Sequence, residues 1–157
     1  MNAARHDHES GYARTPIQKT ALIVGIVFLI VGIGGFIPGL THSTEHLAGA
    51  GAHSEALLLG VFQVSVLHNL VHLAFGIAGV AVAARAAASR AYLIWGGVIY
   101  FVVFLYGLFA VGNEQANFLP VNAADNWLHL VLAVGMVLLG VFVGRNRVAT
   151  SAAGPQR

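Results

Sequence analysis

Long runs of apolar residues, separated by short polar segments, occupy most of the chain. Four runs are long enough to cross the roughly 30 Å hydrocarbon core of a bilayer, which takes about 20 helical residues. They lie at about 21–37, 65–84, 91–112 and 125–144. The pattern predicts an all-α fold: a four-transmembrane-helix bundle made of two antiparallel hairpins, in a membrane domain of residues 16–145.

Capping residues indicate where two of these helices begin. Thr15 followed by Pro16 is typical of a helix start. The second helix has two candidate starts, Ser54 and Ser65, because residues 56–64 are also apolar. We favour Ser65, preceded by a short interfacial or re-entrant segment, since a straight helix from the earlier serine would exceed the hydrocarbon core by several turns.

The composition supports a membrane protein. Of the 157 residues, 57% are hydrophobic and only 9% are charged, whereas soluble domains carry roughly 25% charged residues. The chain has no cysteine, which excludes disulfides, thiolate metal sites, iron–sulfur clusters and cysteine nucleophiles. The net charge of +2 gives no basis for nucleic-acid binding, so the expected partner is the lipid bilayer.

The charges predict how the protein is oriented. All eight Lys and Arg residues flank the predicted spans on one side, and segments 38–64 and 113–124 contain none. By the positive-inside rule both termini are cytoplasmic, an N-in and C-in topology. The polar tails, residues 1–15 and 146–157, would then lie in the cytoplasm, and we expect the first of them to be mobile.

Polar residues recur at helical spacing in the second and fourth spans. His68 and His72 are four residues apart, as are Asp125 and His129. Because unpaired polar groups are costly in hydrocarbon, both stripes are expected to face each other or the bundle centre, near the outer surface. The full set is His68, Asn69, His72, Asp125, Asn126 and His129.

A short internal repeat lies within the same segments. Residues 69–73 and 126–130 share the pattern N-x-x-H-L. Two helical hairpins related by an axis along the membrane normal would produce such a pattern. Chance similarity of three residues is the alternative explanation.

These segments resemble a known family. Residues 68–73, followed by Gly76, and residues 124–130 resemble the uncharacterised bacterial four-helix membrane family called domain of unknown function 4383. The resemblance covers roughly residues 20–145. Members often have Asn-Pro before the first His, where this chain has Ser65-Val66. The resemblance implies four transmembrane helices and a multi-pass protein of the bacterial cytoplasmic membrane, and it implies no activity.

Two classes of function remain open. In the first, the six polar residues form a hydrogen-bonded network that holds the second helix to the fourth, with every polar group satisfied without a ligand. The protein would then be a non-enzymatic structural or accessory subunit of a larger membrane complex or a homo-oligomer. We prefer this interpretation.

The second class is a ligand site that uses the same residues. His68, His72, His129 and Asp125 supply three imidazoles and a carboxylate, a donor set suited to zinc or copper. Haem b, with axial histidines from two helices, is a weaker alternative. The outer side has no Lys or Arg to neutralise haem propionates.

An outer-loop motif is a separate candidate. His42, Glu45 and His46 match the H-x-x-E-H order of inverzincin peptidases. The segment is rich in Gly and Ala and shows no pattern of the helix that such a site requires. A peptidase is therefore not favoured, and these residues remain candidates without an assigned role.

Overall fold

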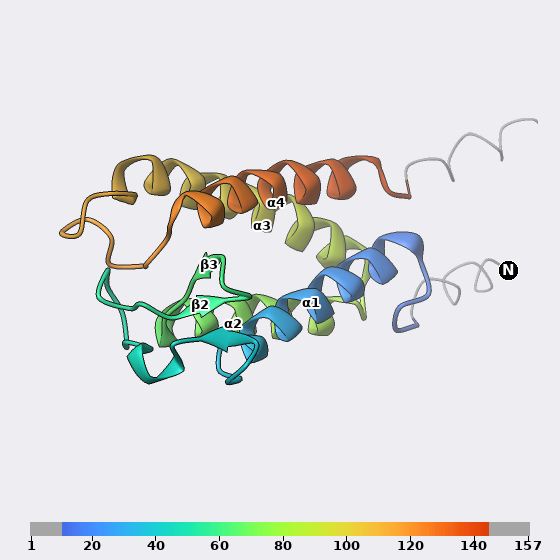
Figure 1. The fold of residues 1–157 in the computed structure, drawn as a ribbon. Coiled ribbons are helices and arrows are strands. Elements are labelled where there is room, and N and C mark those ends of the chain that lie inside the picture. Colours follow the sequence, from blue (N-terminus) through green and yellow to red (C-terminus); the bar gives the residue numbers. More distant parts are fainter. Residues whose placement is uncertain (1–10, 145–157) are drawn as a thin grey trace, which may run out of the picture.

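The computed structural model describes residues 11–144 and contains four helices lying alongside one another (Figure 1). Three are long and apolar enough to span a membrane, and α2, with 17 residues, is a shorter apolar helix of about 25 Å. The mostly helical four-helix fold is confirmed. The helices are α1 (Pro16–Gly34), α2 (Val66–Val82), α3 (Ala86–Ala110) and α4 (Ala123–Phe142).

Side-chain caps define the helix starts. Thr15 caps α1 through a capping box with Gln18, and Pro16 is the first helical residue. The Ser65 hydroxyl accepts a hydrogen bond from the His68 amide, so α2 begins at the later of its two candidate starts. The side chain of Asn122 caps α4 in the same way. Residues 1–10 and 145–157, which include most of both expected tails, lie outside the described part of the chain.

Helix α3 begins five residues earlier than the expected span at 91–112. A short turn joins it to α2, and the Ser89 hydroxyl donates to the Val82 carbonyl across that turn. Arg90 therefore lies within α3, where the expected span had placed it before the helix. Its guanidinium donates to the carbonyls of Gly140 and Val143, at 2.6 and 3.0 Å, near the end of α4.

The chain segment that connects α1 to α2 forms a small sheet, which the hydrophobic pattern did not predict. Strands β1 (Thr41–His42), β2 (Leu57–Leu58) and β3 (Phe62–Gln63) pair antiparallel in that order, with a short 3₁₀ helix, η1 (Thr44–His46), between the first two. This sheet takes the place of the expected interfacial or re-entrant segment. Strands of two residues are too short to give an alternating pattern.

The helices form two hairpins, α1 with α2 and α3 with α4, as expected (Figure 1). Glycine permits the close approach within each hairpin. A Cβ atom at Gly25 would lie 2.7 Å from the Val80 amide nitrogen, and one at Gly97 would lie 2.7 Å from the Ala133 carbonyl oxygen. Small residues of this kind allow helix backbones to pack closely in lipid, where no hydrophobic force drives helices together.

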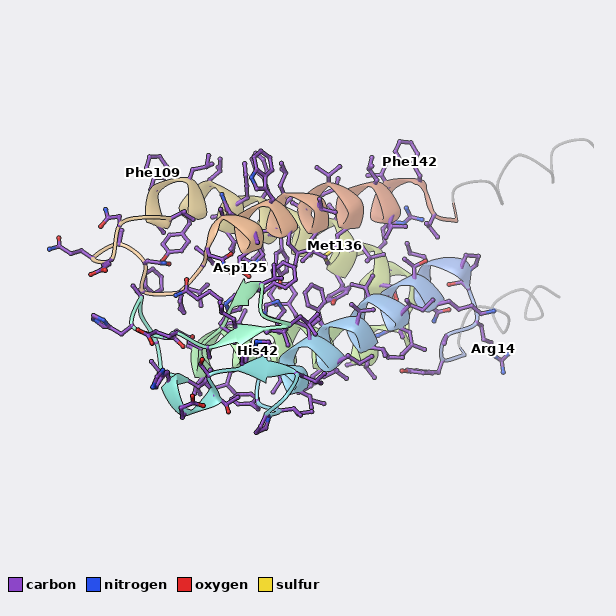
Figure 2. All side chains as sticks on the ribbon, in the orientation of Figure 1. Arg14, His42, Phe109, Asp125, Met136 and Phe142 are labelled. Atoms are coloured by element: carbon purple, nitrogen blue, oxygen red, sulfur yellow. The ribbon has the colours of Figure 1, made fainter. Side chains whose placement is uncertain are left out.

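The two ends of the bundle differ. The described chain ends and the α2–α3 connection lie at one end, and the sheet and the loop between α3 and α4 lie at the other, called here the sheet end (Figure 1). Figure 2 shows Arg14 at the first end and His42 in the sheet. Phe109 and Phe142 project outward, with exposed fractions of 78% and 62%, as expected of side chains that face lipid.

Candidate functional site

Three imidazole rings from α2 and α4 meet inside the bundle near the sheet end. The ring centroids of His68 and His72 are 4.8 Å apart and stacked, and those of His68 and His129 are 6.0 Å apart. All three side chains are buried. Histidines of the second and fourth helices thus lie together inside the protein.

Backbone carbonyls orient two of these rings. The Nδ1 atom of His68 lies 3.0 Å from the Pro120 carbonyl oxygen, and Nδ1 of His72 lies 3.1 Å from the carbonyl oxygen of His68. A carbonyl oxygen can only accept, so Nδ1 carries the proton and donates in both rings. In the neutral tautomer this leaves Nε2 of each ring as a hydrogen-bond acceptor.

Aromatic side chains from α1 and α3 pack against the histidine group. Phe28 lies 5.6 Å from His72, Tyr100 lies 5.5 Å from His129, and the rings of Phe28 and Tyr100 stack at 5.3 Å. The same contact, an aromatic ring against a histidine, thus occurs once in each hairpin. Tyr100 is one of three tyrosines in the apolar run at 91–112, with Tyr92 and Tyr106, and nothing in the sequence pattern distinguishes it from the other two.

Asp125 does not serve the histidines as expected. Its carboxylate accepts hydrogen bonds from the backbone amides of Gln63 in β3, at 2.9 Å, and Asn122, at 3.0 Å. Figure 2 places Asp125 on α4 where the helix faces the sheet. The carboxylate thus completes the cap of its own helix and joins α4 to the sheet.

His68 and Asp125 make reciprocal contacts between the hairpins. His68, from the first hairpin, donates to the carbonyl of Pro120 in the loop of the second. Asp125, from the second, accepts from the amide of Gln63 in the sheet of the first. The sequence separation between the two side chains equals that between the two backbone partners, so the contacts follow the same register as the repeat at 69–73 and 126–130.

The two asparagines of the repeat do not bridge α2 and α4, in contrast to the expected network. Asn69 packs its amide against Gly35 at the end of α1, and Asn126 packs its amide against Gly107 in α3. At each glycine a Cβ atom would overlap the side-chain oxygen of the asparagine. Each asparagine therefore fills equivalent space within its own hairpin.

The network is also not fully satisfied. Four buried side-chain atoms have no hydrogen-bond partner among the described residues. Buried polar groups are nearly always paired, by protein or by ordered water, so each of these atoms requires an explanation. They are Asn69 Nδ2, Tyr100 Oη, Asn126 Oδ1 and His129 Nδ1.

A cavity of about 40 Å³ lies among the rings and is called here the His chamber. A volume of this size holds about one or two water-sized groups, which is far too small for the macrocycle of haem b. Within residues 11–144 no group of three or more His, Asp or Glu side chains is placed to hold a metal ion. The chamber is lined by His68, His72, His129, Tyr100, Phe75 and Ile99, among others.

Residues 18–142 match the model of a protein family described as a domain of unknown function, DUF4383. The chain belongs to the DUF4383 family. The match covers α1 from its third residue, the sheet and the other three helices, and it confirms the resemblance noted from the two histidine segments. Neither the curated proteins nor the solved structures compared with the chain include a match.

The outer-loop motif of this DUF4383 chain does not form a peptidase-like helix. His42 ends strand β1, whereas Glu45 and His46 lie in η1. The imidazole of His46 pairs with Glu55 at 3.2 Å, and both side chains are largely exposed. His42 lies against Gly60, at the turn between β2 and β3. The motif thus contributes surface contacts of the sheet.

Proposed function

We propose that this DUF4383 chain is a non-enzymatic, multi-pass protein of the cytoplasmic membrane, a structural or accessory subunit of a larger membrane assembly or homo-oligomer. Its polar residues at the sheet end hold the two hairpins in one fixed arrangement. The observation that carries this proposal is the reciprocal pair of contacts from His68 to Pro120 and from Asp125 to Gln63.

These contacts suit a structural role because each uses a side chain of one hairpin and the backbone of the other. A third contact also joins a side chain of one hairpin to the backbone of the other, since the side-chain amide of Asn122 donates to the Val61 carbonyl at 2.7 Å. Hydrogen bonds between helices in a membrane contribute about 0.6 kcal/mol each on average. Together they oppose separation of hairpins that otherwise meet mainly through apolar packing.

The charge distribution supports the proposed orientation. Within the described residues every Lys and Arg lies in the half of the bundle opposite the sheet end, namely Arg14, Lys19, Arg85 and Arg90. Three acidic residues lie in the loops of the sheet end, namely Glu45, Glu55 and Glu114. The positive-inside rule then places both described chain ends in the cytoplasm and the sheet outside.

Binding of a transition metal, zinc or copper, is the second candidate function. One observation favours it: His129 Nδ1 is buried with no hydrogen-bond partner among the described residues, and His129 lines the His chamber together with two further imidazoles. Within the described residues, however, no three His, Asp or Glu side chains are placed to hold an ion, and Asp125 is engaged elsewhere.

Purification from native membranes in a mild detergent, followed by light scattering, elemental analysis and an optical spectrum, tests the proposal. We expect a protein mass above that of the 16.4 kDa chain, no stoichiometric metal and no Soret band. The variants H72A and H129A serve as controls, since they remove imidazoles that make neither reciprocal contact. A stoichiometric ion that is lost in both variants, or a Soret band, would overturn the structural role and support ligand binding.

A further inference from the structure

An apolar groove on the outside of the bundle leads to the His chamber. It has a volume of about 360 Å³ and lies between α2 and α3. Phe75 and Ile99 line both the groove and the chamber, so the two spaces adjoin. The groove, called here the α2–α3 groove, is lined by Ala74, Phe75, Ala78, Tyr92, Trp95 and Ile99.

The chamber and the groove differ in chemistry. The chamber contains two residues with an unpartnered buried polar atom, the hydroxyl of Tyr100 and Nδ1 of His129, and both side chains are 3% exposed. The lining of the groove is apolar throughout. One end of the combined space therefore offers hydrogen bonds and the other offers only hydrophobic contact.

The combined space is polar near the sheet end and apolar toward the middle of the bundle, which is the order of polar group and chain in a lipid. The chamber lies in the first three turns of α2, near the sheet end, and the groove continues along α2 to Ala78. From His68 to Ala78 the helix rises roughly 15 Å, about half the thickness of a bilayer core. A lipid of the leaflet at the sheet end also has its polar group at the surface and its chain toward the midplane.

We propose that the His chamber and the α2–α3 groove form one binding site for a single-chain amphiphile with a small, uncharged head group. The head enters the chamber and bonds Tyr100 and His129, and the chain lies in the groove. The head must be small because the chamber holds about one or two water-sized groups. A hydroxyl or carbonyl group meets this limit, and a phosphate head group exceeds it.

An uncharged head follows from the charges around the site. The chamber is lined by no Lys, Arg, Asp or Glu, and the described cationic residues lie toward the other end of the bundle. A buried carboxylate or ammonium group without a partner of opposite charge would be strongly disfavoured. The atoms that would bond the head group, on Tyr100 and His129, take no part in the reciprocal contacts, so failure of this site would leave the proposed structural function intact.

Two tryptophans provide a matched pair of reporters. Trp95 lines the groove and Trp127 lies on α4, away from it, and their exposed fractions are 66% and 65%. In the W127F variant Trp95 is the only tryptophan, and in W95F only Trp127 remains. The probe is ω-bromoundecanol, whose bromine quenches indole fluorescence on contact, titrated into nanodiscs that contain the protein.

We expect saturable quenching of Trp95 and a weaker, non-saturating decline for Trp127, which reports partition into the bilayer. Bromoundecane, which lacks the hydroxyl, should require about 25-fold more probe to half-quench Trp95, since the hydrogen bonds to Tyr100 and His129 are both lost at about fivefold each. Equal half-quenching by the alcohol and the alkane would overturn the proposal. So would quenching of both tryptophans that rises without saturation, because it would indicate partition alone.

Two further variants, made in the W127F protein, test each half of the site. Y100F removes a hydroxyl that has no partner among the described residues, so it should leave the fold unchanged. The amount of bromoundecanol that half-quenches Trp95 should rise about fivefold, because one hydrogen bond to the head group is lost. A78F fills the groove from an exposed position and should abolish the saturable component.

The matched control for A78F is V134F. Val134 is also exposed, but it lines a different apolar groove, between α3 and α4. This variant should quench like its W127F parent. If Y100F and A78F both bind the alcohol like the W127F parent, the site does not exist and the unpartnered atoms bind water only.

Discussion

His68 and Asp125 occupy corresponding positions in α2 and α4, one residue before each asparagine of the repeat, and each bonds the backbone of the opposite hairpin. The two side chains differ in chemistry: the imidazole donates and the carboxylate accepts. The positions thus correspond in place and not in residue type. This relationship links the sequence repeat to the way in which the hairpins are joined.

Removal of the Asp125 carboxylate should destabilise the bundle. D125A loses two hydrogen bonds to backbone amides, and we expect the free energy of unfolding in detergent to fall by about 2–3 kcal/mol. D125N keeps one acceptor oxygen and should lose less. Chemical unfolding followed by circular dichroism measures both effects.

E114A, at an exposed loop position, is the control and should change stability by less than about 0.5 kcal/mol. Equal stability of D125A and E114A would contradict the structural role of the carboxylate.

The contact between Gly35 and Asn69 should not tolerate a methyl group. In G35A the new Cβ atom overlaps the asparagine amide, and we expect a loss of about 1–3 kcal/mol. The N69A substitution should recover part of this loss in the double variant, because it removes the atoms that clash. The same measurements apply to Gly107 with Asn126.

A third glycine provides the control for these variants. A Cβ atom at Gly135 would meet nothing within 4 Å, so G135A should stabilise the helix by about 0.8–1 kcal/mol. Destabilisation by G135A of the size expected for G35A would show that the effect belongs to helix glycines in general and not to the asparagine contact.

Arg90 should hold the last turn of α4 in place. Its guanidinium donates to the carbonyls of Gly140 and Val143, which the end of a helix leaves without intrahelical partners. R90A should therefore accelerate hydrogen exchange of amides near residues 139–144 and leave the first turns of α4 unchanged. Mass spectrometry of deuterated peptides measures this difference. R85A, at an exposed residue just before α3, is the comparison. Unchanged exchange in R90A would show that these hydrogen bonds do not hold the turn.

Cysteine labelling should establish the orientation. The chain has no cysteine, so single cysteines at Glu114 and Ala84 report the two ends without background. Both positions are exposed, the first in the loop at the sheet end and the second in the α2–α3 connection. In intact cells a membrane-impermeant maleimide should label E114C and spare A84C until the membrane is permeabilised. The reverse pattern would place the sheet in the cytoplasm and reject the N-in, C-in topology.

The four helices could be predicted because their signals are local. Each apolar run is long relative to the error in its boundaries, and the serine at position 65 and the Thr15-Pro16 pair marked two starts correctly. The approach of the histidines followed from a general cost, since polar stripes in lipid must turn inward. The sheet could not be predicted in this way, because its strands have only two residues each.

The partners of the polar residues required the tertiary structure. The helical spacing of Asp125 and His129 predicted a carboxylate beside the imidazoles. The carboxylate instead accepts a hydrogen bond from the Gln63 amide, 62 residues away in the chain. The ring contact between Tyr100 and His129 also depends on the tertiary structure. Glycine contacts bring α3 against α4, and the periodicity of the sequence does not specify them.

The sequence by itself determined the number of helices, their approximate bounds and the end of the bundle at which the histidines gather. Apolar length, capping chemistry and charge asymmetry act within a few residues or one turn, so they can be read along the chain. Only the tertiary structure decided which polar atoms pair, which remain unpaired and where a groove meets a chamber. Those outcomes depend on helix rotation and on contacts between distant segments, and no local pattern specifies either.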